Sequence, residues 1–370
     1  MANKDGFLAL LESWVAQELV ALYRHPEPVA KGLLIGASAW GHYVERFLTF
    51  TARSMDAPRN SAALRHNSRT LLFTDGPGFA PLRDYAKARQ ADGFPTQIVV
   101  IPDMILQAAK ADKDFKFYLL GATHNLQVQY AARYGMGYHM SMPDCIYADG
   151  YFPGLLYLAK HYKAIAHTNP SAHVSILDEL PKTGPLSFTP EQLGALTWRH
   201  LHDQSRSNLM NHGHVVDGYP PSFFHIWQAR DALIINSPHL SATYMSPDLC
   251  AKAPIRSMSP IDCQLPFLMG SGFYTPKREH GLVYVEVSDN GKTALHERKD
   301  SEVFAAICWH SVQFRSEYLP FYSASSVFPI PVQQEYLTDA DIAQRHANII
   351  KDICALKDEV EGRIAFREVA

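Results

Sequence analysis

Apolar segments alternate with segments of helical periodicity through the first part of the chain, and this alternation constrains the fold more than any other feature. The apolar segments occupy residues 32–36, 70–74, 97–101 and 138–142. Apolar residues at helical spacing occupy residues 40–54, 80–90 and 115–134. Strands that alternate with helices form mostly parallel sheets with right-handed crossovers. The sequence therefore predicts an α/β fold with a mostly parallel sheet flanked by helices.

The remainder of the chain is less regular. Helical patterns are expected at residues 6–23, 190–209 and 339–360, and a strand at residues 282–287. Thr189 is the expected N-cap of the second of these helices, and Thr338 with Asp341 resembles a capping box for the third. Residues 211–262 are rich in His, Pro, Ser and Tyr, so we expect a loop-rich, irregular C-terminal half.

Composition excludes several classes of protein. Of the 370 residues, 47% are hydrophobic and 19% charged, which is typical of a packed globular protein. The net charge of −3 gives no basic face for nucleic acid. The five cysteines show no C-x-x-C spacing, so neither a disulfide framework nor a cysteine zinc site is expected. No signal peptide and no apolar stretch of membrane-spanning length is evident, so a cytoplasmic location is expected.

Acidic residues follow three of the four expected strands. Asp75, Asp103 and Asp144 stand at these positions, and Asp149 follows five residues after Asp144. Ligands of open α/β sheets bind at the carboxyl ends of the strands, where an Asp can also accept hydrogen bonds from a ribose. Two nearby carboxylates suit Mg²⁺ or Mn²⁺, and such a cation suits a diphosphate. Capping of the next helix or a turn before Gly150 is the alternative for Asp149.

Histidines are concentrated in the middle of the chain and suggest a rival function. A metal-dependent hydrolase or lyase would use a cluster of five residues: His212, His214, Asp217, His225 and His239. Histidine prefers softer metals than magnesium, so this enzyme would carry zinc or iron. The chain lacks G-x-G-x-x-G, a P-loop, H-E-x-x-H and G-x-S-x-G, which lowers the weight of several other enzyme classes. An inactive nucleotide-sugar-binding module is a third alternative.

Several segments together resemble a known family. Residues 40–48 read WGHYVERFL, residues 57–64 read APRNSAAL, residues 142–150 read MPDCIYADG, and residues 199–202 read RHLH. Across residues 32–300 these segments resemble bacterial GT-A-type nucleotide-diphospho-sugar glycosyltransferases of surface-polysaccharide biosynthesis. The chain departs from that pattern at residues 238–243, where a second histidine is missing, and at Cys263-Gln264, where a second acid is common.

The resemblance implies a GT-A-like, Rossmann-like fold and a cytoplasmic glycosyltransferase that moves a sugar from a nucleotide-diphosphate donor to a glycan or other hydroxyl acceptor. It implies a terminal helix at residues 1–30, a nucleotide-sugar-binding half at 31–165, an acceptor and catalytic half at 166–330 and a helical tail at 331–370. Donor-binding candidates are Trp40, Thr74, Asp75, Asn125 and Arg199. Candidate ligands of Mg²⁺ or Mn²⁺ are Asp144, Asp149 and His239, and candidate catalytic residues are Asp262 and His239. Peripheral membrane association and a homo-oligomer remain open.

Overall fold

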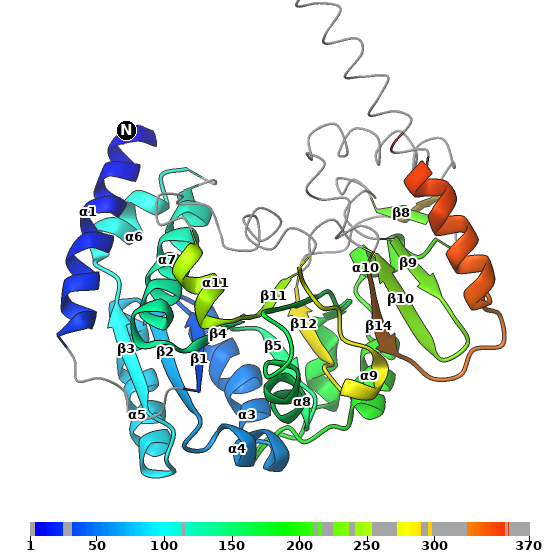
Figure 1. Ribbon diagram of the computed structural model, residues 1–370, viewed down its shortest axis with the longest axis horizontal. Helices are drawn as coiled ribbons and strands as arrows, with labels where there is room; N and C mark the ends of the chain where they lie inside the picture. Colours follow the sequence, from blue (N-terminus) through cyan, green and yellow to red (C-terminus); the bar gives the residue numbers. More distant parts are fainter. Residues whose placement is uncertain are drawn as a thin grey trace, which may run out of the picture.

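The computed structural model describes residues 4–24, 32–112, 115–210, 214–216, 225–236, 241–253, 272–289, 295–297, 324–351 and 354. Its central feature is a six-stranded sheet in the order β3-β2-β1-β4-β11-β6 (Figure 1). The strands are β1 (Leu33–Ser38), β2 (Ser68–Thr74), β3 (Thr96–Val100), β4 (Gly137–Ser141), β6 (Ala164–His167) and β11 (Ser241–Met245). Strands β1 to β4 pair in parallel, whereas β11 is antiparallel to both of its neighbours. The expected α/β class with a mostly parallel sheet is confirmed.

Helices cover both faces of this sheet (Figure 1). One face packs against α1 (Lys4–Tyr23), α6 (Asp103–Ala109), α7 (Phe115–Tyr134) and α11 (Pro247–Lys252). The other packs against α4 (Pro58–Leu64), α5 (Gly76–Ala91), α8 (Tyr151–Leu158) and the helical run 43–55. Successive side chains of a strand point to opposite faces. Accordingly Leu34 belongs to the first core, and Leu33 and Ile35 belong to the second.

The expected helix at residues 40–54 is interrupted. It consists of α2 (Tyr43–Arg46), a π-helical turn η1 (Phe47–Thr51) and α3 (Ala52–Met55). A π-helical turn inserts one residue into the helical repeat and often lies at a functional site. This turn sets the direction of Arg46 relative to Thr51, two residues that recur in the site below.

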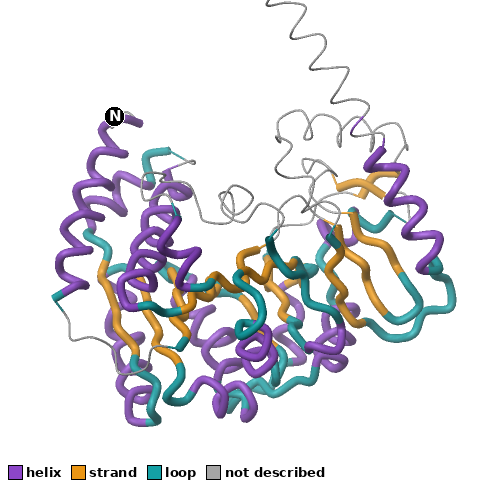
Figure 2. The backbone as a smooth tube through the Cα atoms, in the orientation of Figure 1, coloured by secondary structure: helices purple, strands orange, loops and turns teal. Residues whose placement is uncertain are grey.

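Small sheets form the second half of the described chain, which Figure 2 shows as separate groups of strands. Strand β5 (Cys145–Tyr147) pairs with β12 (Tyr284–Ser288), which also pairs with β7 (Ser171–His173). A second sheet contains β9 (His225–Gln228), β10 (Ala232–Asn236) and β14 (Ser325–Pro329). The short strands β8 (His214–Val216) and β13 (Leu295–Glu297) pair with each other.

Two expectations for this half need correction. The helix expected at residues 190–209 is two helices, α9 (Pro190–Arg199) and α10 (Asp203–Ser207). Residues 211–262 are not mainly loop where they are described, because β9, β10, β11 and α11 lie there. The expected closing helix is present over residues 339–351, with the capping contacts of Thr338 and Asp341 in place, and the rest of its expected range lies outside the described residues except for residue 354, which is also helical. Two 3₁₀ turns, η2 (Val174–Glu179) and η4 (Arg278–His280), also belong to this half.

Helix α1 is long and apolar enough to cross a membrane by length and composition, with a mean hydropathy of 1.2 over its best window. The sequence patterns did not indicate a stretch of this kind. In the fold, Phe7, Leu11 and Trp14 on this helix pack into the core that it shares with α7 and the sheet. The same composition therefore also serves a helix that covers a sheet.

Candidate functional site

The carboxyl ends of β1 and β4 define the candidate site. Strand β1 connects onward to β2 on one side, and β4 lies on its other side, so the direction of winding reverses between β1 and β4. In open α/β sheets this topological switch point is where ligands bind. The segments that leave the two strands here are residues 39–46 and residues 142–144.

Asp75 ties the segment after β1 to helix α5. Its Oδ2 accepts a hydrogen bond from the Gly41 backbone N–H at 2.8 Å, and its Oδ1 accepts one from the Gly78 N–H at 2.8 Å. Gly41 has a φ of +59°, a conformation that glycine adopts without strain. Asp75 therefore caps α5 and holds the loop before α2, and a donor ribose would meet a carboxylate that already has two partners.

Close packing at the start of α5 accounts for Gly78. A Cβ atom there would lie 2.3 Å from Thr74 Oγ1 and 2.7 Å from Val44 Cγ2. Thr74 is fully buried, and its hydroxyl has no hydrogen-bond partner among the described residues. Thr74 is thus the last residue of β2, at the carboxyl edge of the sheet, but it lies below the surface that a ligand would reach.

Asp144 and Arg46 meet at the other side of α2. Arg46 Nη1 lies 3.9 Å from Asp144 Oδ2, and its Nη2 lies 2.6 Å from Asp289 Oδ2. The same guanidinium donates to the Val287 carbonyl at 3.3 Å and lies 5.6 Å from the centre of the Tyr43 ring. Helix α2 consequently lies between two acidic positions, with Asp75 at its beginning and Asp144 at its end.

Glu286 completes an acidic pair with Asp144. Burial raises the pKa of Asp144 to about 6, opposed by the charge of Arg46 and reinforced by that of Asp289. The pKa of Glu286 is raised to about 7, first by burial and then by the charge of Asp144, while Arg46 lowers it. Burial thus favours the protonated form of both carboxyl groups, and a negative charge on Asp144 raises the pKa of Glu286 further. Arg46 is a single positive charge near three carboxyl groups, those of Asp144, Glu286 and Asp289. The site therefore favours binding of a further cation or protonation of a carboxyl group.

The backbone around Asp144 is held from two directions. Thr51 Oγ1 lies 3.0 Å from both the Met142 and the Cys145 carbonyl oxygens, to which its hydroxyl donates. The Val287 N–H donates to the Asp144 carbonyl at 2.9 Å, which extends the β5–β12 ladder to the acid itself. The π-helical turn that ends at Thr51 and the strand that carries Glu286 thus fix the position of Asp144.

The donor set at this position fits a magnesium or manganese ion only in part. Carboxylate oxygens are the ligands these ions prefer, and Mg²⁺ commonly takes one or two of them together with substrate phosphates and water. Among the residues that the structure describes, no three His, Cys, Asp or Glu side chains converge on one point as a complete ligand set would. Asp144 would supply the protein's share, with a diphosphate and water completing the shell and Glu286 left free beside it.

Asp149 does not share an ion with Asp144, which corrects the expectation from the sequence. Residues 144–148 run extended along β12, so the two acids lie at opposite ends of β5, about 13 Å or more apart at ~3.3 Å per residue. Asp149 Oδ1 accepts from the backbone N–H groups of Arg59 and Asn60 at 2.8 and 3.2 Å, at the start of α4. Its Oδ2 accepts from Ser187 Oγ at 3.0 Å. Asp149 is a helix cap.

The other sequence candidates are scattered. Arg199 is an exposed residue at the end of α9, where its Nη2 donates to Glu179 at 2.5 Å in a surface ion pair. Trp40 is half-buried directly after β1 and packs against the core under α1 and α7. Asn125 is buried within α7. His239 and Asp262 lie outside the described residues.

The histidine cluster of the rival function is described only in part. His212, Asp217 and His239 lie outside the described residues, and for His214 only the backbone in β8 is described. His225 is fully buried at the start of β9. The rival ligand set therefore stays a prediction.

Sequence patterns missed Arg46, Glu286 and Asp289. Glu286 had a usable signal, because it is an acid in the middle of the apolar strand Leu282-Val-Tyr-Val-Glu-Val. A charged residue at a position of a strand that faces protein needs a partner or a function. Its partner Asp144 is distant in sequence, and only the pairing of β5 with β12 brings the two together.

Comparisons with known proteins give distant matches. No protein-family model and no curated protein sequence matches the chain. Among solved structures, residues 1–349 of S. aureus TarS match with a TM-score of 0.34 and 9% identity, covering 88% of this chain and 71% of that one. Mouse xyloside xylosyltransferase 1 in its apo form matches with a TM-score of 0.26 and 12% identity, covering 64% and 74%. Similarity at this level does not by itself establish a shared fold or activity.

Proposed function

We propose that this protein is a glycosyltransferase that moves a sugar from a nucleoside-diphosphate donor to a hydroxyl of a glycan or small-molecule acceptor, in the cytoplasm. The observation that carries the proposal is the acidic pair Asp144–Glu286, placed with Arg46 at the topological switch point of the sheet. The segments at residues 40–48 and 142–150 resemble those of GT-A-type enzymes, and they lie on the two sides of this switch point.

The charges support a diphosphate leaving group. The nucleoside diphosphate carries growing negative charge as the sugar leaves, so the site needs cations that are already in position. Arg46 provides one such cation and is held by Asp289 and the Val287 carbonyl. A divalent ion on Asp144 would act as a Lewis acid on the diphosphate oxygens.

The pKa of Glu286 supports a role as general base. A base works best when its pKa lies near the working pH, and the pKa of Glu286 is raised to about 7. Glu286 would accept the proton of the acceptor hydroxyl as it attacks the sugar. Asp262 and His239, the candidates from the sequence, remain predictions for the same step.

Ligand binding tests the proposal in two stages. UDP, GDP, CDP and dTDP are screened with Mn²⁺ for thermal stabilisation, because a ligand that binds only the native state raises the melting temperature. The stabilising diphosphate is then titrated by calorimetry into the wild type, Asp144→Asn and the control Asp178→Asn, an exposed acid on η2. We expect Asp144→Asn alone to lose affinity, by about tenfold or more, as when a metal's surroundings are altered. Unchanged affinity in Asp144→Asn would exclude the metal-diphosphate role of that residue.

A second measurement separates a transferase from an inactive binding module. Donor sugar is incubated with the protein and water or acceptor, and release of nucleoside diphosphate is followed. We expect slow hydrolysis that Glu286→Gln reduces while donor affinity is largely kept. Binding of the donor without any turnover in the wild type would support the inactive module instead.

A further inference from the structure

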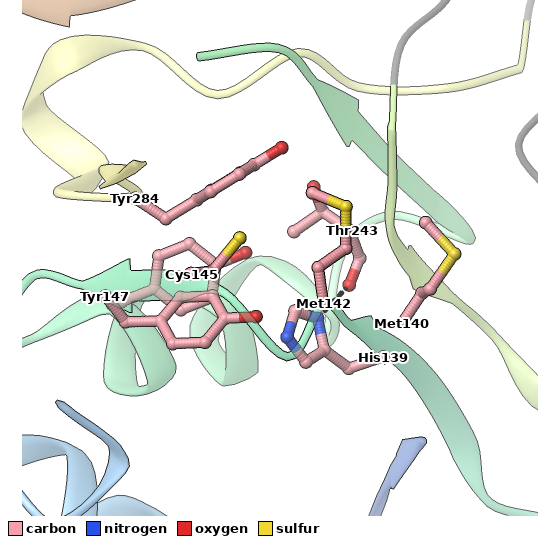
Figure 3. A pocket seen from close by; sticks show the side chains of 8 residues that line it. His139, Met140, Met142, Cys145, Tyr147, Thr243 and Tyr284 are labelled. Atoms are coloured by element: carbon pink, nitrogen blue, oxygen red, sulfur yellow. Dashed lines mark hydrogen bonds between the residues drawn. The ribbon is translucent and has the colours of Figure 1, made fainter. Parts of the chain in front are cut away.

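A small cavity lies beside the turn that carries Asp144. Its lining includes His139, Met140, Met142 and Cys145, all from one seven-residue segment, together with side chains of Tyr147, Tyr151, Thr243 and Tyr284 (Figure 3). About 10 Å³ inside is open to the centre of a water-sized sphere, close to the space that a single water molecule requires. The cavity is thus large enough for one water or one small ion and for little else.

The imidazole of His139 presents a lone pair that has no partner. His139 is 1% exposed, and its Nδ1 is hydrogen-bonded to the Thr243 carbonyl oxygen, which can only accept. Nδ1 therefore carries the proton, and Nε2 is left as an acceptor. Nε2 has no hydrogen-bond partner among the described residues. A buried acceptor without a partner costs free energy, so this atom indicates an occupant of the cavity.

The same hydrogen bond is the one that metal-binding histidines usually make. A histidine that ligates a metal through one nitrogen commonly donates its other N–H to a carbonyl or carboxylate, which fixes the ring. Thr243 is itself fixed, because its Oγ1 lies 2.8 Å from His167 Nδ1. The orientation of His139 is thus set before any ligand arrives.

Sulfur atoms supply the other donors around this cavity. Cys145 is a free, fully buried thiol, and the thioether of Met142 lines the same space, as Figure 3 shows. Met140 also contributes to the lining. Thiolate and thioether ligands are soft and suit copper(I), and imidazole also suits copper.

The number and type of ligands favour copper(I) over zinc. Burial, followed by the charges of Asp144 and Glu286, raises the pKa of the Cys145 thiol, so a metal ion must displace its proton. Structural zinc sites also take four ligands of Cys, His or carboxylate type. Only His139 and Cys145 among the lining residues are of that type.

We propose that His139 Nε2, Cys145 Sγ and Met142 Sδ form a site for one copper(I) ion. The ion satisfies the imidazole nitrogen that has no hydrogen-bond partner among the described residues. On binding, the thiol proton of Cys145 is released to solvent and the sulfur becomes the anionic ligand. Its three ligands do not include Asp144, so copper(I) binding can be measured without a sugar donor or Mg²⁺.

Anaerobic titration of the full chain with copper(I), in competition with a chromogenic copper(I) chelator, tests the site. We expect one ion per chain and a thiolate-to-copper charge-transfer band. Cys145→Ser should abolish stoichiometric binding. Met142→Leu keeps the volume of the side chain and should weaken binding by at least about tenfold.

Two matched variants serve as controls. Met136→Leu and Cys250→Ser alter a buried methionine and a buried cysteine that do not line the cavity, so both should bind copper(I) like the wild type. X-ray absorption at the copper edge should show mixed sulfur and nitrogen ligands. The proposal is overturned if the wild type takes up no copper(I), as expected for a cavity that holds only water. It is also overturned if Met142→Leu and Cys145→Ser bind as tightly as the controls.

Discussion

Asp144→Asn should make the folded protein more stable at pH 8, which is an unusual result for removal of a charge that lies near an arginine. The pKa of Asp144 is about 6 in the folded protein against 3.8 for an unperturbed aspartate, because burial disfavours the charged form more than Arg46 favours it. The folded state therefore binds this proton more tightly than the unfolded state does. Its contribution to stability is fully present below about pH 4 and is lost as the pH rises through about 6.

The difference between the two pKa values corresponds to about 3 kcal/mol of stability lost by pH 8. For 370 residues, an unfolding entropy of about 2 cal/mol/K per residue converts this free energy into about 4 °C of melting temperature. Asparagine resembles the protonated acid in shape, so the variant should avoid this loss. It also removes the negative charge that raises the pKa of Glu286.

Urea unfolding and thermal melts of both proteins at pH 5 and pH 8 measure the effect. We expect the advantage of Asp144→Asn to grow from pH 5 to pH 8, while Asp178→Asn, altered at an exposed position, follows the wild type. If Asp144→Asn is less stable than the wild type at pH 8, Asp144 is a stabilising ion-pair partner of Arg46. Burial of the Asp144–Glu286 pair would then not lower the stability of the folded protein.

Three further predictions concern the surroundings of the site. Asp149→Ala should lower the free energy of unfolding by about 1–2 kcal/mol through loss of the α4 cap, and leave donor affinity unchanged in calorimetry; a loss of affinity would restore Asp149 to the donor site. Gly78→Ala should lower the free energy of unfolding in urea by about 1–3 kcal/mol, because the added Cβ meets Thr74 and Val44. Adding Thr74→Ala should recover part of that loss, and additive losses in the double variant would refute the packing argument. Affinity for Mn²⁺ in the presence of nucleoside diphosphate should rise between about pH 5.5 and 7.5, because the raised pKa values of Asp144 and Glu286 keep both groups protonated at the lower pH. Titrations of Asp144→Asn across this range should show a smaller rise.

Strand positions in the first half could be predicted from the sequence because strands in the middle of a parallel sheet are covered on both faces. Short continuous apolar runs such as residues 32–36 and 70–74, with glycine or proline at or close to their ends, are typical of such strands. The strand β10 in the second half is also apolar, but it lies in a region whose composition of His, Pro and Ser is typical of loops. Local composition therefore hid a hairpin that tertiary pairing with β14 stabilises.

Only those residues of the candidate site that directly follow a strand could be predicted from the sequence. Asp75 and Asp144 follow their strands in sequence, so their place at the carboxyl edge follows from the pattern. The spacing of Asp144 and Asp149 suggested a shared ion, but an extended strand between them carries the two carboxylates apart. Arg46 and Glu286 join the site through the π-helical turn and the β5–β12 register, and neither feature has a local signature in the sequence.

Crystals soaked with Mn²⁺ and the nucleoside diphosphate that most stabilises the protein test the central claim most directly. The account predicts a diphosphate between residues 40–46 and the Asp144–Glu286 pair, with the ion on Asp144 and the guanidinium of Arg46 turned toward the phosphates. Density for the nucleotide elsewhere, with Arg46 still bound to Asp289 and Asp144 without an ion, would contradict it.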